Sequence, residues 1–69
     1  MDISARNVFK GTVKSVDHGA VNSEVIIQLP GGLEIVSIIT KESAERLELT
    51  SKKQCYAIVK ATDVLIGTD

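Results

Sequence analysis

The sequence has few of the residues on which many enzymes and metal proteins depend. Cys55 is its only cysteine and His18 its only histidine. No internal disulfide can form, and there is no Cys/His cluster of the kind that binds zinc. A Cys–His pair for nucleophilic catalysis, a glycine-rich phosphate loop and metal-ligand spacing are also absent. We therefore expect a protein that is not an enzyme and that offers no direct ligands to a metal ion.

Aromatic residues and net charge are also low. Phe9 and Tyr56 are the only aromatic side chains, and eight basic against nine acidic residues give a formal net charge of −1. A barrel that binds single-stranded nucleic acid normally carries several stacking aromatics and a basic groove. Nucleic acid is therefore not an expected partner, and any attraction for anions must come from local positive charge.

Long apolar runs are missing as well. The start, Met1-Asp2-Ile3, has neither the basic nor the apolar segment of a signal peptide, and no stretch approaches the roughly 20 apolar residues of a membrane span. The unpaired cysteine fits a reducing compartment, where we expect it to fill space in the core or an interface. These features predict a cytoplasmic protein that makes no contact with a membrane.

Strand patterns punctuated by turn residues dominate the 69 residues, which we treat as a single domain, 1–69. The predicted strands cover residues 8–16, 23–29, 33–40, 54–60 and 63–66. Pro30-Gly31-Gly32 predicts a tight hairpin turn. A short helix is predicted after Thr40, its N-cap. This order is that of an all-β, five-stranded Greek-key barrel of the OB type with one short helix.

Apolar residues occur on both faces of two predicted strands. In residues 25–27 and 35–39, both the odd and the even positions include apolar residues. A domain of this size buries only about 60% of its unfolded surface, and it rarely gains more than about 3–5 kcal/mol from one core. Because no disulfide can supplement that core, we expect an oligomer in which a second subunit covers the additional apolar face.

Three clusters of hydrogen-bond donors are what the sequence does contain. They are Ser4-Ala5-Arg6-Asn7, Thr40-Lys41-Glu42-Ser43 and Lys60-Ala61-Thr62. Guanidinium, ammonium, hydroxyl and free backbone N–H groups all donate hydrogen bonds, and a helix N-terminus also favours negative charge. Together they suit a small oxyanion, although their spacing does not identify which one.

Each candidate residue also has a purely structural interpretation. Arg6 could pair with a surface carboxylate, and Lys60 could be a solvated charge at a strand edge. Ser43 could be an inert surface hydroxyl. His18 precedes a glycine in a predicted turn, where a solvated side chain is the simpler interpretation.

Several segments occur in an order that resembles one known family. They are Ser4-Ala5-Arg6-Asn7 and residues 10–13, 18–22, 38–44 and 56–62. They resemble the molbindins, small cytoplasmic proteins that bind molybdate or tungstate and whose domain recurs in molybdate-responsive regulators and transporter ATPases. The resemblance implies an OB-like barrel, a hexamer built as a trimer of dimers, oxyanion sites between subunits, and a role in molybdate or tungstate storage and homeostasis.

The resemblance also implies two kinds of site. The first would use Ser4 and Arg6 from one subunit, and from a neighbour Thr40, Ser43, Lys60 and either Ala61 or Thr62. A second candidate site would use the turn residues Gly19, Ala20, Val21 and Asn22, largely through their backbone.

Two positions depart from the family pattern. The loop 50–53 lacks the glycine that such proteins usually place before the fourth strand, and Thr62 stands where a serine is often found. The alternative functions are an oxyanion-sensing regulatory domain of a transporter or transcription regulator, and a generic OB-like nucleic-acid or ligand-binding module.

Overall fold

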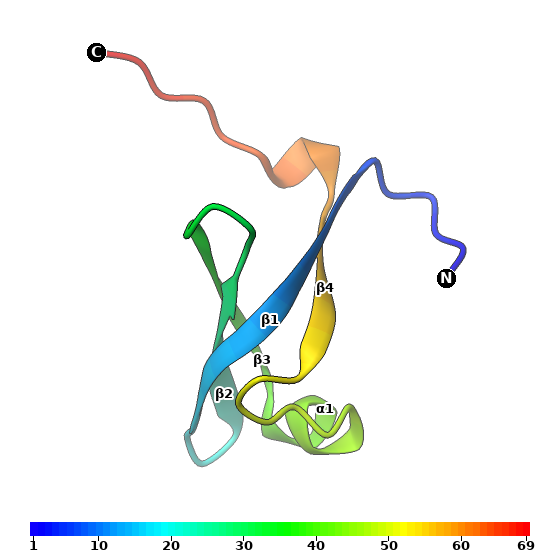
Figure 1. Cartoon of the computed structure of the whole chain (residues 1–69), viewed down its shortest axis with the longest axis vertical. Helices are drawn as coiled ribbons and strands as arrows, with labels where there is room; N and C mark the ends of the chain where they lie inside the picture. Colours follow the sequence, from blue (N-terminus) through cyan, green and yellow to red (C-terminus); the bar gives the residue numbers. More distant parts are fainter.

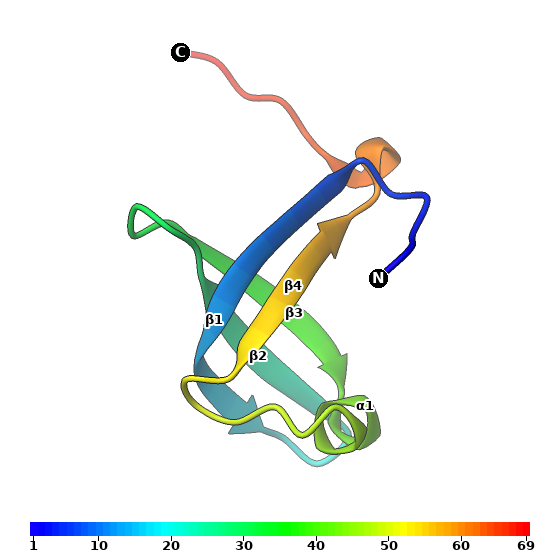
Figure 2. The same cartoon turned by 45° about the vertical axis from the view of Figure 1, so that its right-hand side comes forward.

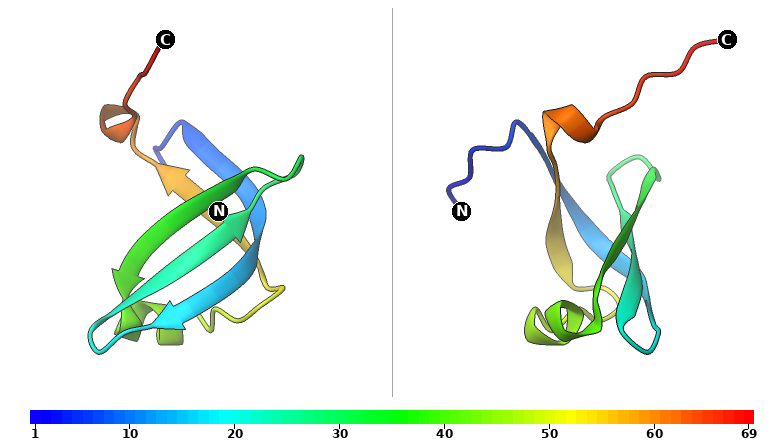
Figure 3. Two further views of the ribbon diagram at one scale, coloured as in Figure 1. Left: turned by 90° about the vertical axis from the view of Figure 1, so that its left-hand side faces the viewer. Right: turned by 180° about the vertical axis from the view of Figure 1, so that it is seen from behind.

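A computed structural model describes all 69 residues and contains one antiparallel sheet. The elements in chain order are β1 (Asn7–His18), β2 (Asn22–Gln28), β3 (Glu34–Thr40), α1 (Lys41–Arg46), β4 (Gln54–Val59) and the 3₁₀ helix η1 (Ala61–Asp63). The strand order across the sheet is β3-β2-β1-β4. The sheet curls into half of a barrel, so that β3 and β4 are its two free edges (Figures 1 and 3).

The long strand β1 changes partner at its middle and thereby turns the sheet. Residues Asn7 to Thr12 pair with β4, whereas residues Thr12 to His18 pair with β2, with a register shift between Val13 and Ser15. Such an irregularity bends a strand and increases its twist.

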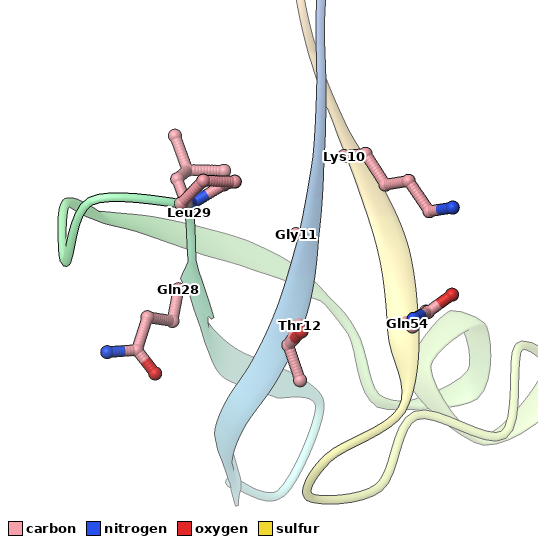
Figure 4. Close-up of a pocket in the computed structure, with 7 residues that line it drawn as sticks. Lys10, Gly11, Thr12, Gln28, Leu29 and Gln54 are labelled. Atoms are coloured by element: carbon pink, nitrogen blue, oxygen red, sulfur yellow. The ribbon is translucent and has the colours of Figure 1, made fainter.

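Gly11 lies at the point where β1 crosses from one partner to the other, and it lines a surface hollow together with Lys10, Thr12 and Gln54 (Figure 4). A Cβ atom here would lie 2.7 Å from Ile27 Cγ2 and 2.8 Å from the Gln28 carbonyl oxygen. Only glycine allows β1 and β2 to approach this closely.

A small core occupies the concave side of the sheet. Val13, Val25, Ile27 and Ala57 form its fully buried centre, and they come from β1, β2 and β4. Ser23 shares this face and is also buried, while Ala44 of α1 closes one end. Only seven of 69 residues are buried, so the stability that burial can supply within one chain is small.

The predicted hairpin turn and helix cap are confirmed. Gly31 and Gly32 have φ angles of 90° and 88°, a region that favours glycine. Thr40 caps α1, because its Oγ1 accepts a hydrogen bond of 3.0 Å from the Ser43 amide. The helix has six residues, and no helix is long and apolar enough to cross a membrane.

The loop before β4 shows where the missing glycine would stand. Lys52 has a φ angle of 75°, in the left-handed region that side chains with a Cβ atom rarely adopt. Its amide donates to the Val13 carbonyl at 2.8 Å, and the Lys53 amide donates to the Thr50 carbonyl at 3.1 Å. The backbone therefore keeps a glycine-type turn although the sequence supplies a lysine.

Replacing Lys52 with glycine should stabilise the protein by about 1 kcal/mol, because it removes the strain of the left-handed conformation and leaves both hydrogen bonds intact. For a domain of this size the melting temperature should rise by about 4–8 °C. Lys52→Ala is the matched control, since it removes the charge and keeps Cβ, and it should give no such increase. Equal melting temperatures for the two variants would contradict this explanation.

The predicted fifth strand is wrong for the isolated chain. Residues 63–66 form no strand; the chain makes the η1 turn and then extends away from the sheet (Figure 2). Leu65 and Ile66 are 94% and 91% exposed. The apolar pattern predicted a strand, but a strand also needs an edge to pair with, and none within this chain receives the segment. The fold is therefore a four-stranded half-barrel rather than a five-stranded barrel.

Apolar surface remains uncovered between the two free edges. A cavity of about 330 Å³ separates β3 from β4, and seven of its eight lining residues are hydrophobic. On the outer face of β3, Val36 and Ile38 are 59% and 61% exposed. The chain exposes 5535 Å² in all, whereas folded monomers of 7.4 kDa expose about 4,200 Å². The isolated chain thus leaves apolar surface exposed that a monomer of this size would bury.

Candidate functional site

The main candidate site forms where the chain enters β1 and leaves β4. Asn7 and Val59 are the last pair of the β1–β4 ladder, so the segments before Asn7 and after Val59 leave the sheet side by side (Figure 2). Together they line a pocket of about 380 Å³. Its lining includes five of the predicted site residues: Ser4, Arg6, Lys60, Ala61 and Thr62. We call these five residues the terminal cluster.

The charged groups of the terminal cluster have no ionic partner. The one salt bridge in the structure joins Lys14 to Glu34, on β1 and β3, so neither Arg6 nor Lys60 is neutralised by a carboxylate. Both side chains are exposed. The interpretation of Arg6 as half of a surface ion pair therefore finds no support in the structure.

Backbone donors are also free in the terminal cluster. Lys60 precedes η1, and within this helix the Asp63 and Val64 amides donate to the carbonyls of Lys60 and Ala61. The amides of Ala61 and Thr62 donate to no backbone acceptor. Ala61 can thus contribute only through its backbone, whereas Thr62 also offers a hydroxyl.

Thr40 and Ser43 lie at the opposite end of the half-barrel, beside α1 (Figure 1). Thr40 Oγ1 donates to Ser43 Oγ at 2.8 Å and accepts from the Ser43 amide at 3.0 Å. The two hydroxyls share one hydrogen bond, so one of their two hydrogens is left for another acceptor.

One chain therefore does not bring all seven predicted residues of the first site together. It does bring Arg6 and Lys60 into one pocket. Thr40 and Ser43 could join that pocket only from another copy of the chain.

The second candidate site, the β1–β2 turn, is partly closed by its own hydrogen bonds. The Gly19 amide donates to the Asn22 carbonyl at 2.7 Å, and the Val21 carbonyl accepts from the Lys41 amide at 2.7 Å. The amides of Ala20 and Val21 donate to no backbone acceptor and remain available.

Sequence reasoning missed one residue beside this turn. Ser23 is 1% exposed, and its Oγ lies 2.6 Å from His18 Nδ1. The signal was present in the sequence, because alternation places residue 23 on the same face as Val25 and Ile27.

Cys55 takes no part in either site. It lies in β4, half-buried beside the core. Burial raises the pKa of its thiol, which disfavours the reactive thiolate. The expectation that this cysteine fills space is consistent with its position.

Residues 3–66 match the model of one protein family, the TOBE domain. The chain belongs to this family. The TOBE domain described here is 42% identical over 69 residues to a probable molybdenum-pterin-binding protein of Haemophilus influenzae, and the match covers all of both chains. The resemblance to the molbindins is thereby confirmed.

Solved structures share the fold of this TOBE domain. MopII from Clostridium pasteurianum superposes with a TM-score of 0.93 at 42% identity, over 97% of this chain and all of the other. The cytoplasmic molybdate-binding protein ModG, in a crystal form with molybdate bound, gives a TM-score of 0.96 at 43% identity. That match covers the whole TOBE domain described here and 49% of the ModG chain.

Proposed function

We propose that this TOBE-domain protein binds molybdate or tungstate in the cytoplasm, without catalysing a reaction, and serves the storage or homeostasis of the anion. The observation that carries the proposal is the terminal cluster, because the residues that line this one pocket carry two unpaired cations, two hydroxyls and two free amides. The names of its full-length relatives and of ModG support the same ligand class.

The chemistry of the terminal cluster favours a fully deprotonated tetrahedral dianion. Molybdate and tungstate have four oxygens that only accept hydrogen bonds at neutral pH. No carboxylate lines the pocket, so its side chains offer cations and hydroxyls to these oxygens. Phosphate carries a proton for much of the time near neutral pH, and that proton would need an acceptor of its own. Sulfate has the same charge as molybdate but shorter bonds, so cavity size is the one property by which the site can reject it.

A neighbouring chain completes the site in this proposal. All five residues of the terminal cluster are exposed to solvent. Ser43 of a second chain, oriented by Thr40, would supply a further hydroxyl. Thr40 then acts by positioning Ser43, since its Oγ1 contacts both the hydroxyl and the amide of that residue. The bound anion joins two subunits.

The assembly we propose is a hexamer, a trimer of dimers. A second chain would cover the apolar surface that one chain leaves exposed. This surface includes the cavity between β3 and β4 and the tail at Leu65 and Ile66. A tail from one chain laid between the free edges of another would provide the fifth strand of an OB-like barrel. The β1–β2 turn would form the second oxyanion site, near the threefold axis.

Calorimetric titration with molybdate, tungstate, sulfate and phosphate in parallel tests the ligand. We expect saturable binding of molybdate and tungstate, and at least tenfold weaker binding of sulfate and phosphate. Each tenfold step corresponds to about 1.4 kcal/mol. Equal, weak heats for all four anions would contradict the proposed function and leave a generic OB-like module.

A further inference from the structure

His18 and Ser23 form a hydrogen-bonded pair at the end of the β1–β2 hairpin. They face each other across the last row of the ladder, with His18 Nδ1 2.6 Å from Ser23 Oγ. Ser23 is 1% exposed and its side chain has no other hydrogen-bond partner, whereas His18 is exposed. A buried hydroxyl thus contacts one nitrogen of a ring that reaches the surface.

The burial of Ser23 determines which ring nitrogen carries the hydrogen. Its hydroxyl hydrogen requires an acceptor, because a buried unpaired donor is unfavourable. Nδ1 is the one acceptor that the structure provides. Nδ1 therefore presents its lone pair, and in the neutral ring the hydrogen lies on Nε2. The two nitrogens point in divergent directions, so the Nε2–H group is directed away from Ser23 and the core.

Two backbone donors follow His18 in the same turn. The amides of Ala20 and Val21 are free, and the turn that carries them is held at both sides. The Gly19–Asn22 hydrogen bond closes it, and the bond from the Lys41 amide to the Val21 carbonyl ties it to the start of α1, which lies beside the turn in Figure 2. Three N–H groups from residues 18, 20 and 21 thus occur on one short, fixed segment.

The nearest carboxylates of the hairpin do not share this face. Asp17 and Glu24 are paired in the row next to His18 and Ser23. Successive side chains of a strand point to opposite faces, so these two acids lie on the other side of the sheet from the buried Ser23. They do not compete for the Nε2–H donor.

We propose that His18 donates from Nε2–H to the second oxyanion site, together with the amides of Ala20 and Val21. Ser23 is a positioning residue that selects the ring tautomer and does not touch the anion. The inference rests on the proposed function, because the ligand is again molybdate or tungstate, but it concerns a site separate from the terminal cluster. Since it relies on N–H dipoles rather than on a guanidinium and an ammonium, this site should be the weaker of the two.

Nitrogen NMR of the full-length protein tests this directly, because His18 is the only histidine. In the anion-free protein we expect an unprotonated Nδ1 and a protonated Nε2, and saturating molybdate should shift the Nε2 signal. Ser23→Ala should abolish the tautomer preference. His18→Phe, which keeps a planar ring without a donor, should weaken binding at the second site about tenfold. His18→Gln, which restores an N–H donor, should recover part of it.

The outcomes separate this inference from the proposed function. A hydrogen on Nδ1, or an Nε2 signal that stays fixed in saturating molybdate, would overturn the role of His18. If calorimetry still showed molybdate binding at the terminal cluster in that case, the proposed function would hold without the second site. The absence of any molybdate heat would overturn both. His18→Phe and Arg6→Lys should affect different binding steps, and loss of the same step in both variants would contradict the existence of two sites.

Discussion

Replacing Arg6 with lysine should weaken tungstate binding about tenfold or more and leave the fold intact. The guanidinium group can donate two parallel hydrogen bonds to two oxygens of one anion, and an ammonium group on a shorter, flexible chain cannot reproduce this geometry although the charge is kept. Loss of one hydrogen bond to a charged group corresponds to about 1.5–3 kcal/mol. Titration calorimetry measures the affinity, and circular dichroism checks the secondary structure.

The chain offers a matched control for this substitution. Arg46 is its other arginine and lies in the last turn of α1, outside the terminal cluster. Arg46→Lys should leave the tungstate affinity unchanged. If Arg6→Lys behaved in the same way as this control, Arg6 would be a solvated surface residue and the terminal cluster would lose its main anchor.

Lys60→Ala should remove the stabilisation that the anion gives to the protein. A ligand at a hundredfold excess over its dissociation constant stabilises the folded state by about 2.7 kcal/mol per site. Losing the ammonium group removes about 1.5–3 kcal/mol of binding, so most of the tungstate-induced rise in melting temperature should disappear. The anion-free variant should melt close to the parent protein. Lys10→Ala, at an exposed lysine of β1 outside the terminal cluster, should retain the full tungstate-induced rise.

Mixed oligomers show which chain supplies which group. If Arg6 and Lys60 act from one chain, mixing Arg6→Ala with Lys60→Ala subunits restores no site, because every cluster lacks one cation. Mixing Arg6→Ala with Ser43→Ala subunits restores some sites. The Ser43→Ala subunit supplies an intact terminal cluster, and the Arg6→Ala subunit supplies an intact Ser43. Recovery in the first mixture would instead place Arg6 and Lys60 on different chains. Light scattering verifies the oligomers, and a monomer at micromolar concentration would contradict every shared site.

Local features of the fold were predictable because they depend on neighbouring residues. Pro30-Gly31-Gly32 specified a turn through backbone conformations that glycine tolerates, and Thr40 specified a helix start through one hydrogen bond to Ser43. The core face of β2 followed from the alternation of Val25 and Ile27. Each of these depends on the chain within a few residues, where sequence patterns are informative.

Features that depend on distant partners were less predictable. Residues 63–66 have the composition of a strand, but a strand forms only where the segment can pair with a free edge of the sheet. Within this chain the segment pairs with neither free edge, β3 or β4. The left-handed Lys52 could be suspected only because a glycine was expected in that loop. The hydrogen bond between His18 and Ser23 required the pairing register of β1 and β2, which turn and strand patterns do not specify.

The candidate site likewise has one part that the sequence predicts and one part that it does not. The residue types were predictable, since cations, hydroxyls and amides suit an oxyanion wherever they gather. Which of them lie together in one chain depends on β1 pairing with β4, a long-range contact that residue types do not specify. That pairing brings Ser4 and Arg6 beside Lys60 within one chain and leaves Thr40 and Ser43 at the far end.

The position of tungsten in crystals grown with tungstate tests the central claim most directly, because its anomalous scattering locates the atom without reference to the protein. The account predicts tungsten within hydrogen-bonding range of the terminal cluster of one chain, through Arg6, Lys60 and the amides of Ala61 and Thr62, with Ser43 of a second chain on its other side. Tungsten absent from this pocket, in crystals that hold it elsewhere, would contradict the account.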